Sequence, residues 1–345
     1  MNYRNLLARL GAGLIFYAQT GAELALASVP KDAPKDIKYI LGFYYGNGEN
    51  ILIRENNGRL ELLYRTALED KSFAAANLYP LSKVHFDSYT LQESGPMSNT
   101  EAGVRFERDP ELKQSGSVEF VPPSRYFLGT TAGERAKPFR LEERSAEDWA
   151  KLRAEAAKAT VPAALAAGEH AQLVDAATVA GVKVHSVYAG SDNLFGAPLY
   201  TTPKLFVALG KVQQRLAPYG YGLVLWDAYR PWSVSKLANL ALPADNKDML
   251  EDPETKGSTH NTGNAVDVGL YSLESGEELD MGCGFDEPSL RQYASYAGGT
   301  SRERYLRSLL REEMELQGFK GIEMEWWHFE YGDCSKFAHL NISNE

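Results

Sequence analysis

Between about residues 38 and 141, hydrophobic and polar positions alternate in the two-residue period of β-strands, and clusters of turn-forming residues interrupt them. Residues 51–64 carry apolar positions on both sides of Asn57-Gly58, a dipeptide favoured in two-residue hairpin turns. Further strands, separated by Gly, Pro, Ser and Asn, are predicted at 84–91, 103–107 and 117–121. This region therefore predicts a small antiparallel β accessory domain, whose partner the sequence does not indicate.

The pattern becomes helical after this domain. Residues 142–172 are rich in Ala, Glu, Lys and Arg, which favour helix, and predict a helical linker. Residues 203–216 have the apolar stripe of an amphipathic helix and lead into an apolar strand at 221–226. The stripe, with spacings of three and four, consists of Leu205, Leu209, Val212 and Leu216. Because helices and strands are mixed here, residues 173–345 predict an α+β domain.

The first 27 residues have the features of a secretory signal peptide. Arg4 and Arg9 precede an apolar stretch at 10–18, and small residues suited to cleavage follow at 25–27. The apolar stretch is too short to span a bilayer, so no integral membrane segment is expected in the mature chain. The alternative is an ordinary N-terminal helix. A signal peptide predicts a periplasmic or secreted protein.

Composition narrows the possible functions. The chain has 44% hydrophobic and 24% charged residues, as folded globular proteins do, and a formal net charge of −10. Nucleic acid is not expected as a partner, because phosphate binding needs a clustered basic surface. Cys283 and Cys334 could form a disulfide in an oxidising compartment or remain two isolated thiols.

Two segments of the α+β domain contain the residue types of a metal site. His260 precedes Asp267 by seven positions, and Gly263 permits a tight turn between them. In Glu325-Trp-Trp-His328, the carboxylate and the imidazole reach one side only if the backbone is helical or turned. Two histidines and one aspartate would leave the fourth tetrahedral position of zinc for water, as in catalytic sites. Glu325 would then be free to accept a proton from that water.

A third segment, Trp226-Asp-Ala-Tyr-Arg230-Pro231, follows the apolar strand directly. Arg230 could stabilise the oxyanion of a tetrahedral intermediate by its charge. It could instead form an ordinary ion pair, for example with Asp227.

These three segments resemble the VanX-type D-alanyl-D-alanine dipeptidases, zinc peptidases of family M15 (subgroup D) that are related by fold to Hedgehog domains. The patterns S-x-H-x-x-G-x-A-x-D, W-D-x-Y-R-P and E-W-W-H carry the resemblance, which covers about residues 173–342. It implies a C-terminal Hedgehog-like peptidase domain with one Zn²⁺ per chain. By the resemblance, the metal ligands are His260, Asp267 and His328, the general base is Glu325, and the transition-state cation is Arg230.

The resemblance also implies residues that bind a small-molecule dipeptide. Tyr188 lies in a Y-A-x-x-D-N stretch and would face the substrate, Asp286 ends an M-G-x-x-F-D stretch and would receive the free ammonium group, and Ser258 would help with the carboxylate. The implied activity is hydrolysis of D-Ala-D-Ala in cell-wall turnover or glycopeptide resistance. Alternatives are a D,D-carboxypeptidase or other cell-wall peptidase acting on longer stems, or a non-catalytic zinc-containing binding module.

Overall fold

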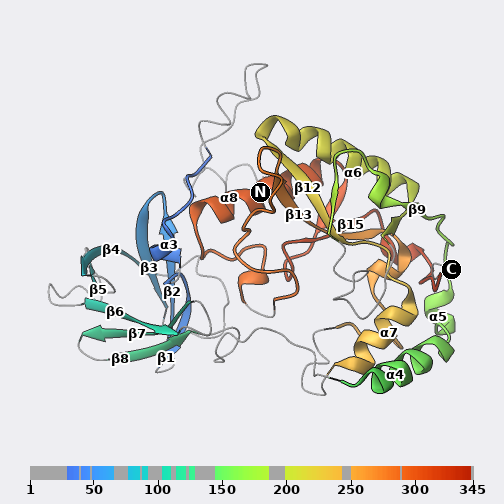
Figure 1. The fold of residues 1–345 in the computed structure, drawn as a ribbon, viewed down its shortest axis with the longest axis horizontal. Coiled ribbons are helices and arrows are strands. Elements are labelled where there is room, and N and C mark those ends of the chain that lie inside the picture. Colours follow the sequence, from blue (N-terminus) through green and yellow to red (C-terminus); the bar gives the residue numbers. More distant parts are fainter. Residues whose placement is uncertain are drawn as a thin grey trace.

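The computed structural model contains a β-barrel followed by a domain in which helices pack on a mixed sheet (Figure 1). The structure describes residues 29–38, 40–46, 49–65, 77–85, 88–91, 103–109, 114–121, 124–128, 144–185, 199–242, 250–287 and 290–342. The predicted signal peptide and the stretch around Tyr188 lie outside these residues. Within the described ranges, no helix combines the length and the apolar character needed to cross a membrane.

The N-terminal part is a closed barrel in which each strand pairs antiparallel with the next and β1 pairs with β8. A short helix, α3 (Lys35–Lys38), precedes it. The strands are β1 (Gly42–Gly46), β2 (Glu49–Asn56), β3 (Arg59–Arg65), β4 (Asn77–His85), β5 (Ser88–Leu91), β6 (Gly103–Asp109), β7 (Gln114–Val121) and β8 (Ser124–Leu128). An antiparallel β element in this region is therefore confirmed.

The predicted hairpin at Asn57-Gly58 joins β2 to β3. Both turn residues have positive φ angles, 49° and 83°, as a two-residue turn with the twist of a hairpin requires. The strand predicted at 84–91 is wrong as a single element. β4 ends at His85 and β5 begins at Ser88, and these two residues pair with each other. This stretch contains no Gly or Pro, and Asp87-Ser88 alone was too weak a turn signal to divide it into two strands.

The C-terminal domain has a five-stranded sheet in the order β10-β12-β13-β15-β14. Its strands are β10 (Lys183–Val184), β12 (Tyr221–Asp227), β13 (Ala265–Ser272), β14 (Phe319–Gly321) and β15 (His328–Tyr331). β10 runs parallel to β12, and the other neighbours are antiparallel. Every residue of β12 is buried, which explains its continuous apolar sequence. A smaller sheet pairs β9 (Val174–Asp175) with β11 (Tyr200–Thr201).

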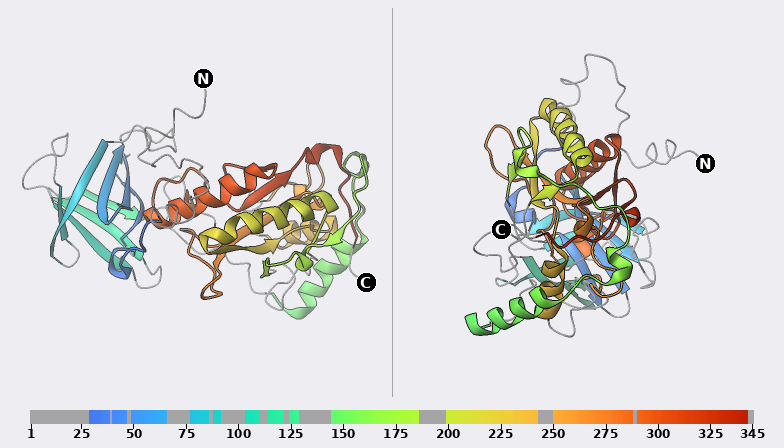
Figure 2. Two further views of the ribbon diagram at one scale, coloured as in Figure 1. Left: turned by 90° about the horizontal axis from the view of Figure 1, so that it is seen from above. Right: turned by 90° about the vertical axis from the view of Figure 1, so that its right-hand side faces the viewer.

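Helices α6 (Pro203–Leu216) and α8 (Ser301–Leu316) lie side by side along the sheet (Figure 2). The predicted stripe of α6 is buried in the main core, so this helix is confirmed. Helix α8 was not predicted, although Thr300 and Glu303 form a capping box at its start.

The segment predicted as a helical linker contains α4 (Ala146–Lys158) and the short α5 (Ala163–Ala166). Trp149 and Ala156 of α4 pack against α7 (Trp232–Ala241). The helix is therefore held against the C-terminal domain through its apolar side.

Candidate active site

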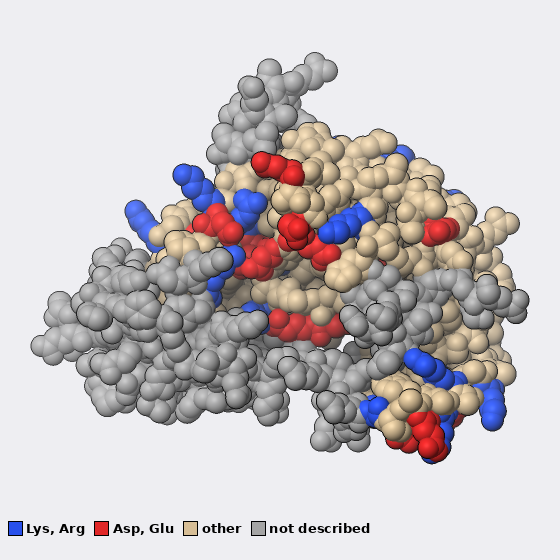
Figure 3. All heavy atoms as spheres, viewed as in Figure 1, with Lys and Arg blue, Asp and Glu red and all other residues tan. Residues whose placement is uncertain are grey.

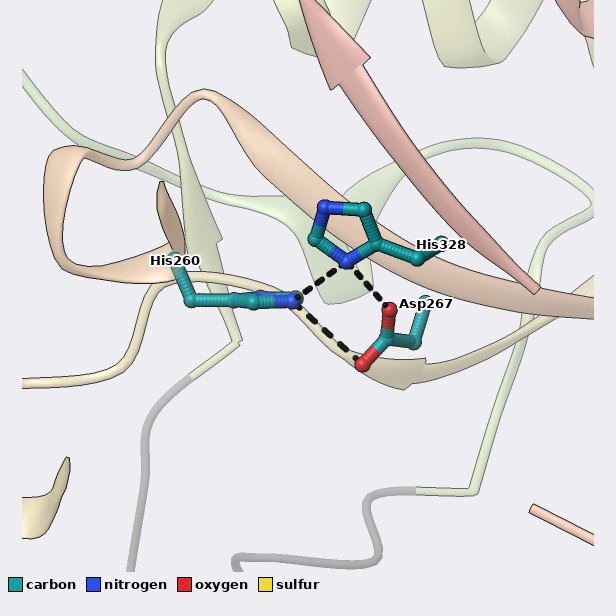
Figure 4. A group of neighbouring side chains, drawn as sticks. All are labelled: His260, Asp267 and His328. Atoms are coloured by element: carbon teal, nitrogen blue, oxygen red, sulfur yellow. Dashed lines mark hydrogen bonds and ion pairs between the residues drawn. The ribbon is translucent and has the colours of Figure 1, made fainter. Parts of the chain in front are cut away.

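Three chain segments bring His260, Asp267 and His328 together, and we call these residues the metal triad. Asp267 on β13 and His328 at the start of β15 are direct cross-strand partners. His260 lies in the short turn η4 (Thr259–Thr262), and Gly263 continues the chain with a φ of 73°. Figure 4 shows the three side chains pointing toward one another.

The spacing of the triad suits one metal ion. Nε2 of His260 lies 3.1 Å from Nδ1 of His328 and 3.4 Å from Oδ2 of Asp267. Nδ1 of His328 lies 3.0 Å from Oδ1 of Asp267. A tetrahedral zinc ion with bonds of about 2.0–2.2 Å separates its ligands by roughly 3.3–3.6 Å. The three buried side chains could therefore hold such an ion with little adjustment.

The second nitrogen of the His260 imidazole fixes where its lone pair points. Nδ1 of His260 lies 2.6 Å from the carbonyl oxygen of Ala228, and a carbonyl oxygen only accepts, so Nδ1 donates and Nε2 presents its lone pair to the triad. Nε2 of His328 faces Oγ1 of Thr259 at 3.4 Å and Oε1 of Glu330 at 3.8 Å. Two imidazoles and a carboxylate directed at one point require a positive charge there.

The pKa shifts of His328 and Asp267 likewise favour a positive charge within the triad. Burial by itself lowers the pKa of His328, but hydrogen bonds with Asp267 and Glu330 raise it to about 10. Burial raises the pKa of Asp267, yet the two histidines hold it well below its usual range. The triad therefore stabilises a positive charge, which a proton or a metal cation can supply.

Glu325 lies beside the triad in the turn that leads into β15. The backbone N–H of His328 donates to the carbonyl oxygen of Glu325 at 3.3 Å, which gives the turned backbone that the spacing required. Burial and the charge of Asp267 raise the pKa of Glu325, while both histidines and Arg230 lower it. Glu325 is not one of the three clustered ligands, but the charges of that cluster act on its carboxylate.

Arg230 is buried and forms an ion pair with Asp227. Its Nε and Nη2 atoms donate to Oδ2 of Asp227 at 3.1 and 2.5 Å, and the same oxygen lies 3.4 Å from Nδ1 of His260. The sequence analysis left open an ion pair or a catalytic cation. The structure contains the ion pair, and the effect of Arg230 on Glu325 keeps its charge relevant to the site. Asp227, the last residue of β12, thus connects the guanidinium to the triad. In the sequence, its position directly after the predicted apolar strand was the feature that pointed to it.

Contacts with Trp326 and Trp327 fix a neighbouring loop, residues 279–287, which we call the substrate loop because it carries Asp286, predicted above to bind the ammonium group of the substrate. The indole of Trp326 donates to Sγ of Cys283 at 3.2 Å, and the ring centroids of Phe285 and Trp327 lie 5.6 Å apart. Cys283 and Cys334 are both free thiols, so the disulfide alternative does not hold in this structure. The loop is therefore anchored to the Glu325 turn.

The structure describes two of the three residues predicted to bind the substrate. Oγ of Ser258 accepts from the backbone N–H of His260 at 3.3 Å, so it caps the turn that carries a triad histidine. Asp286 is partly buried on the substrate loop with a φ of 55°, immediately after Phe285. Tyr188 lies outside the described residues. The structure thus brings together the triad, Glu325 and Arg230, while the substrate-binding roles stay predictions.

A cavity of about 600 Å³ opens along the substrate loop. Acidic side chains gather around a hollow on the face shown in Figure 3. The acidic residues that line the cavity are Glu278, Asp280, Glu287 and Glu303. Lys38 and Leu41, which belong to the N-terminal segment just before β1, line it as well. The segment before the barrel and the C-terminal domain therefore both border this cavity.

A buried group of nitrogen and oxygen ligands with an adjacent carboxylate and guanidinium has the features of a metal-dependent hydrolase. Comparison with known proteins supports that class. Residues 169–342 match the sequence family Peptidase_M15, described as D-ala-D-ala dipeptidase.

Individual relatives agree over the same domain. A D-alanyl-D-alanine dipeptidase of Enterococcus faecalis is 35% identical over 176 residues, covering 44% of this chain and 87% of that protein. One of Escherichia coli is 34% identical over 176 residues, covering 49% and 89%. One of Enterococcus faecium is 33% identical over 174 residues, covering 44% and 86%. The chain belongs to the D-Ala-D-Ala dipeptidase family of M15 metallopeptidases.

Proposed function

We propose that this protein is a zinc-dependent hydrolase of the free dipeptide D-Ala-D-Ala. The observation that carries the proposal is the convergence of His260, Asp267 and His328, with the lone pair of His260 oriented inward and Glu325 beside the three. Membership of a family whose relatives bear the name D-alanyl-D-alanine dipeptidase supports the choice of substrate. Nitrogen and carboxylate ligands in this number favour Zn²⁺, one per chain.

The proposed mechanism uses Glu325 and Arg230 as the catalytic side chains. When bound to the triad, zinc would make a water molecule more acidic and polarise the scissile carbonyl. Glu325 accepts the proton of the attacking water and delivers it to the leaving amine. Arg230 stabilises the negative charge that develops on the carbonyl oxygen, and Asp227 fixes the position of its guanidinium.

Recognition of a dipeptide requires groups for both of its charged ends. In this proposal Asp286 binds the free ammonium, Ser258 assists at the carboxylate, and Tyr188 contacts the substrate between them. A longer or acylated peptide has no free ammonium group next to Asp286, so this carboxylate would be covered without its partner. Because burying an unpaired charge is costly, such a peptide would bind poorly.

We further propose a periplasmic or secreted location and a Hedgehog-like fold for the catalytic domain. The features of the first 27 residues support export. Outside the cytoplasm, turnover of cell-wall D-Ala-D-Ala is a more natural role than removal of a cytoplasmic precursor, which is the basis of glycopeptide resistance.

A substrate panel tests the proposal. The full chain, loaded with Zn²⁺, is incubated with D-Ala-D-Ala, N-acetyl-D-Ala-D-Ala and L-Ala-L-Ala, and each released alanine enantiomer is quantified. We expect rapid hydrolysis of the free D,D-dipeptide alone. Equal hydrolysis of the acetylated substrate would favour a D,D-carboxypeptidase, and no hydrolysis by zinc-loaded protein would favour a non-catalytic binding module.

A further inference from the structure

The barrel is joined to the C-terminal domain by buried polar contacts at the start of α8. The carboxylate of Glu55, which is 3% exposed, accepts from the backbone N–H of Ser301 at 2.7 Å. The N–H of Glu55 donates to the carbonyl oxygen of Gly299 at 3.0 Å, and the N–H of Asn57 donates to Oγ of Ser301 at 2.8 Å. The β2–β3 hairpin thus satisfies a backbone donor that every helix leaves free at its first turn.

Apolar packing reinforces this junction. Leu52 and Leu63, on paired strands of the barrel, form a buried cluster with Tyr296 of the C-terminal domain. The guanidinium of Arg304 crosses the junction as well, donating to the carbonyl oxygens of Glu55 at 2.8 Å and Gly299 at 3.0 Å. Packing and hydrogen bonding together fix the barrel relative to α8.

Helix α8 in turn holds the substrate loop. Arg307, which is 5% exposed, donates to the carbonyl oxygen of Met281 at 2.6 Å and to that of Tyr296 at 2.9 Å. Gly282 leaves the space that this guanidinium occupies, because an added Cβ would lie 2.6 Å from Nη1 of Arg307. The loop is thereby tied to the same helix that the barrel caps.

Lys38 reaches this loop directly from the segment before the barrel. Its Nζ lies 3.1 Å from Oδ1 of Asp32 in its own segment, 3.2 Å from Oδ2 of Asp280 and 3.7 Å from Oε1 of Glu303. Asp280 also caps the loop, since its Oδ1 accepts from the N–H of Gly282 at 3.0 Å. Of these three carboxylates, one belongs to the loop and one to α8, so the cation holds the beginning of the loop against the helix.

We propose that Lys38 is a positioning residue for substrate binding, through which the N-terminal segment fixes the substrate loop that carries Asp286. This rests on the proposed function for the role of Asp286. Without Lys38, the carboxylates of Asp280 and Glu303 repel each other, and the cavity leaves the loop room to move away from α8. The triad and Glu325 lie on other elements, so binding is affected more than chemistry.

The kinetic test compares Lys38→Met, Lys38→Arg and a matched control, Lys31→Met, because Lys31 is an exposed lysine of the same segment. For hydrolysis of D-Ala-D-Ala we expect Lys38→Met to raise KM about two- to fivefold with kcat nearly unchanged, a size typical of a partly exposed ion pair. Lys38→Arg should restore KM, and Lys31→Met should leave it unaltered. The effects of Lys38→Met and Asp280→Asn should be less than additive.

A second readout does not depend on activity. Hydrogen exchange of residues 279–287 should accelerate in Lys38→Met and not in Lys31→Met, while exchange in β13 stays the same. Unchanged hydrogen exchange of residues 279–287 together with an unchanged KM in Lys38→Met overturns the inference. A fall of kcat as large as the rise of KM also overturns it, because it would indicate general damage. If the wild-type protein hydrolyses no dipeptide, the proposed function fails, and the exchange data still decide whether Lys38 holds the loop.

Discussion

Replacing Glu325 by glutamine separates its catalytic role from its structural one. The change keeps the size of the side chain and leaves the turn intact, because His328 donates to the backbone carbonyl of residue 325 and not to its carboxylate. Loss of a general acid–base group lowers kcat by about 10²–10⁴-fold, which corresponds to roughly 3–5.5 kcal/mol in the activation free energy. Alanine release from D-Ala-D-Ala by the zinc-loaded variant measures this directly.

The same variant should be more stable when the metal has been removed. Burial and Asp267 raise the pKa of Glu325 above its ordinary value of 4.5, so the folded protein binds this proton more tightly than the unfolded chain does. Wild-type stability is therefore lost as the pH rises from 4.5 through the folded pKa, whereas glutamine does not titrate. In thermal unfolding of metal-free protein, Glu325→Gln should exceed wild type at pH 7 and approach it near pH 4. If Glu325→Gln hydrolysed the dipeptide at the wild-type rate and its melting temperature at pH 7 equalled that of wild type, the assignment of Glu325 would be refuted.

Three further outcomes are expected. Arg230→Met should lower kcat/KM by about 10²–10³-fold and move the acid limb of the pH–rate profile to higher pH, because the guanidinium lowers the pKa of Glu325; an unmoved limb would contradict this coupling. Asp286→Asn should raise KM for the free dipeptide far more than it lowers kcat, as initial-rate kinetics would reveal. Gly269→Ala should destabilise the fold by about 1–3 kcal/mol in denaturant unfolding, because the new Cβ would lie 2.4 Å from the ring of Trp226.

Local chemistry made parts of the fold predictable from the sequence. The Asn57-Gly58 turn and the α6 stripe each depend on neighbouring residues, and both were found. Closure of the barrel depends on pairing between positions far apart, such as Tyr44 with Leu128, for which a single sequence contains no local signal. Glu55 likewise looks like an ordinary polar strand residue, and only the three-dimensional structure reveals it at the start of α8.

The candidate site divides in the same way. Short motifs identified the triad and Glu325, because the donor types and spacings of a metal site are visible in the sequence. The partner that orients His260 is the backbone carbonyl of Ala228, which has no side-chain signal. The ion pair of Asp227 with Arg230 was an alternative that the sequence offered, whereas the contact of Asp227 with His260 is visible only in the fold.

Metal stoichiometry tests the central claim most directly. Protein dialysed against Zn²⁺ and then against metal-free buffer is analysed by mass spectrometry for bound metal per chain, in wild type, His260→Ala, His328→Ala and Glu325→Gln. We expect one ion per chain in wild type and in Glu325→Gln, and a large loss in both histidine variants. Absence of a stoichiometric ion in the wild-type protein, or full retention in the histidine variants, would contradict the account.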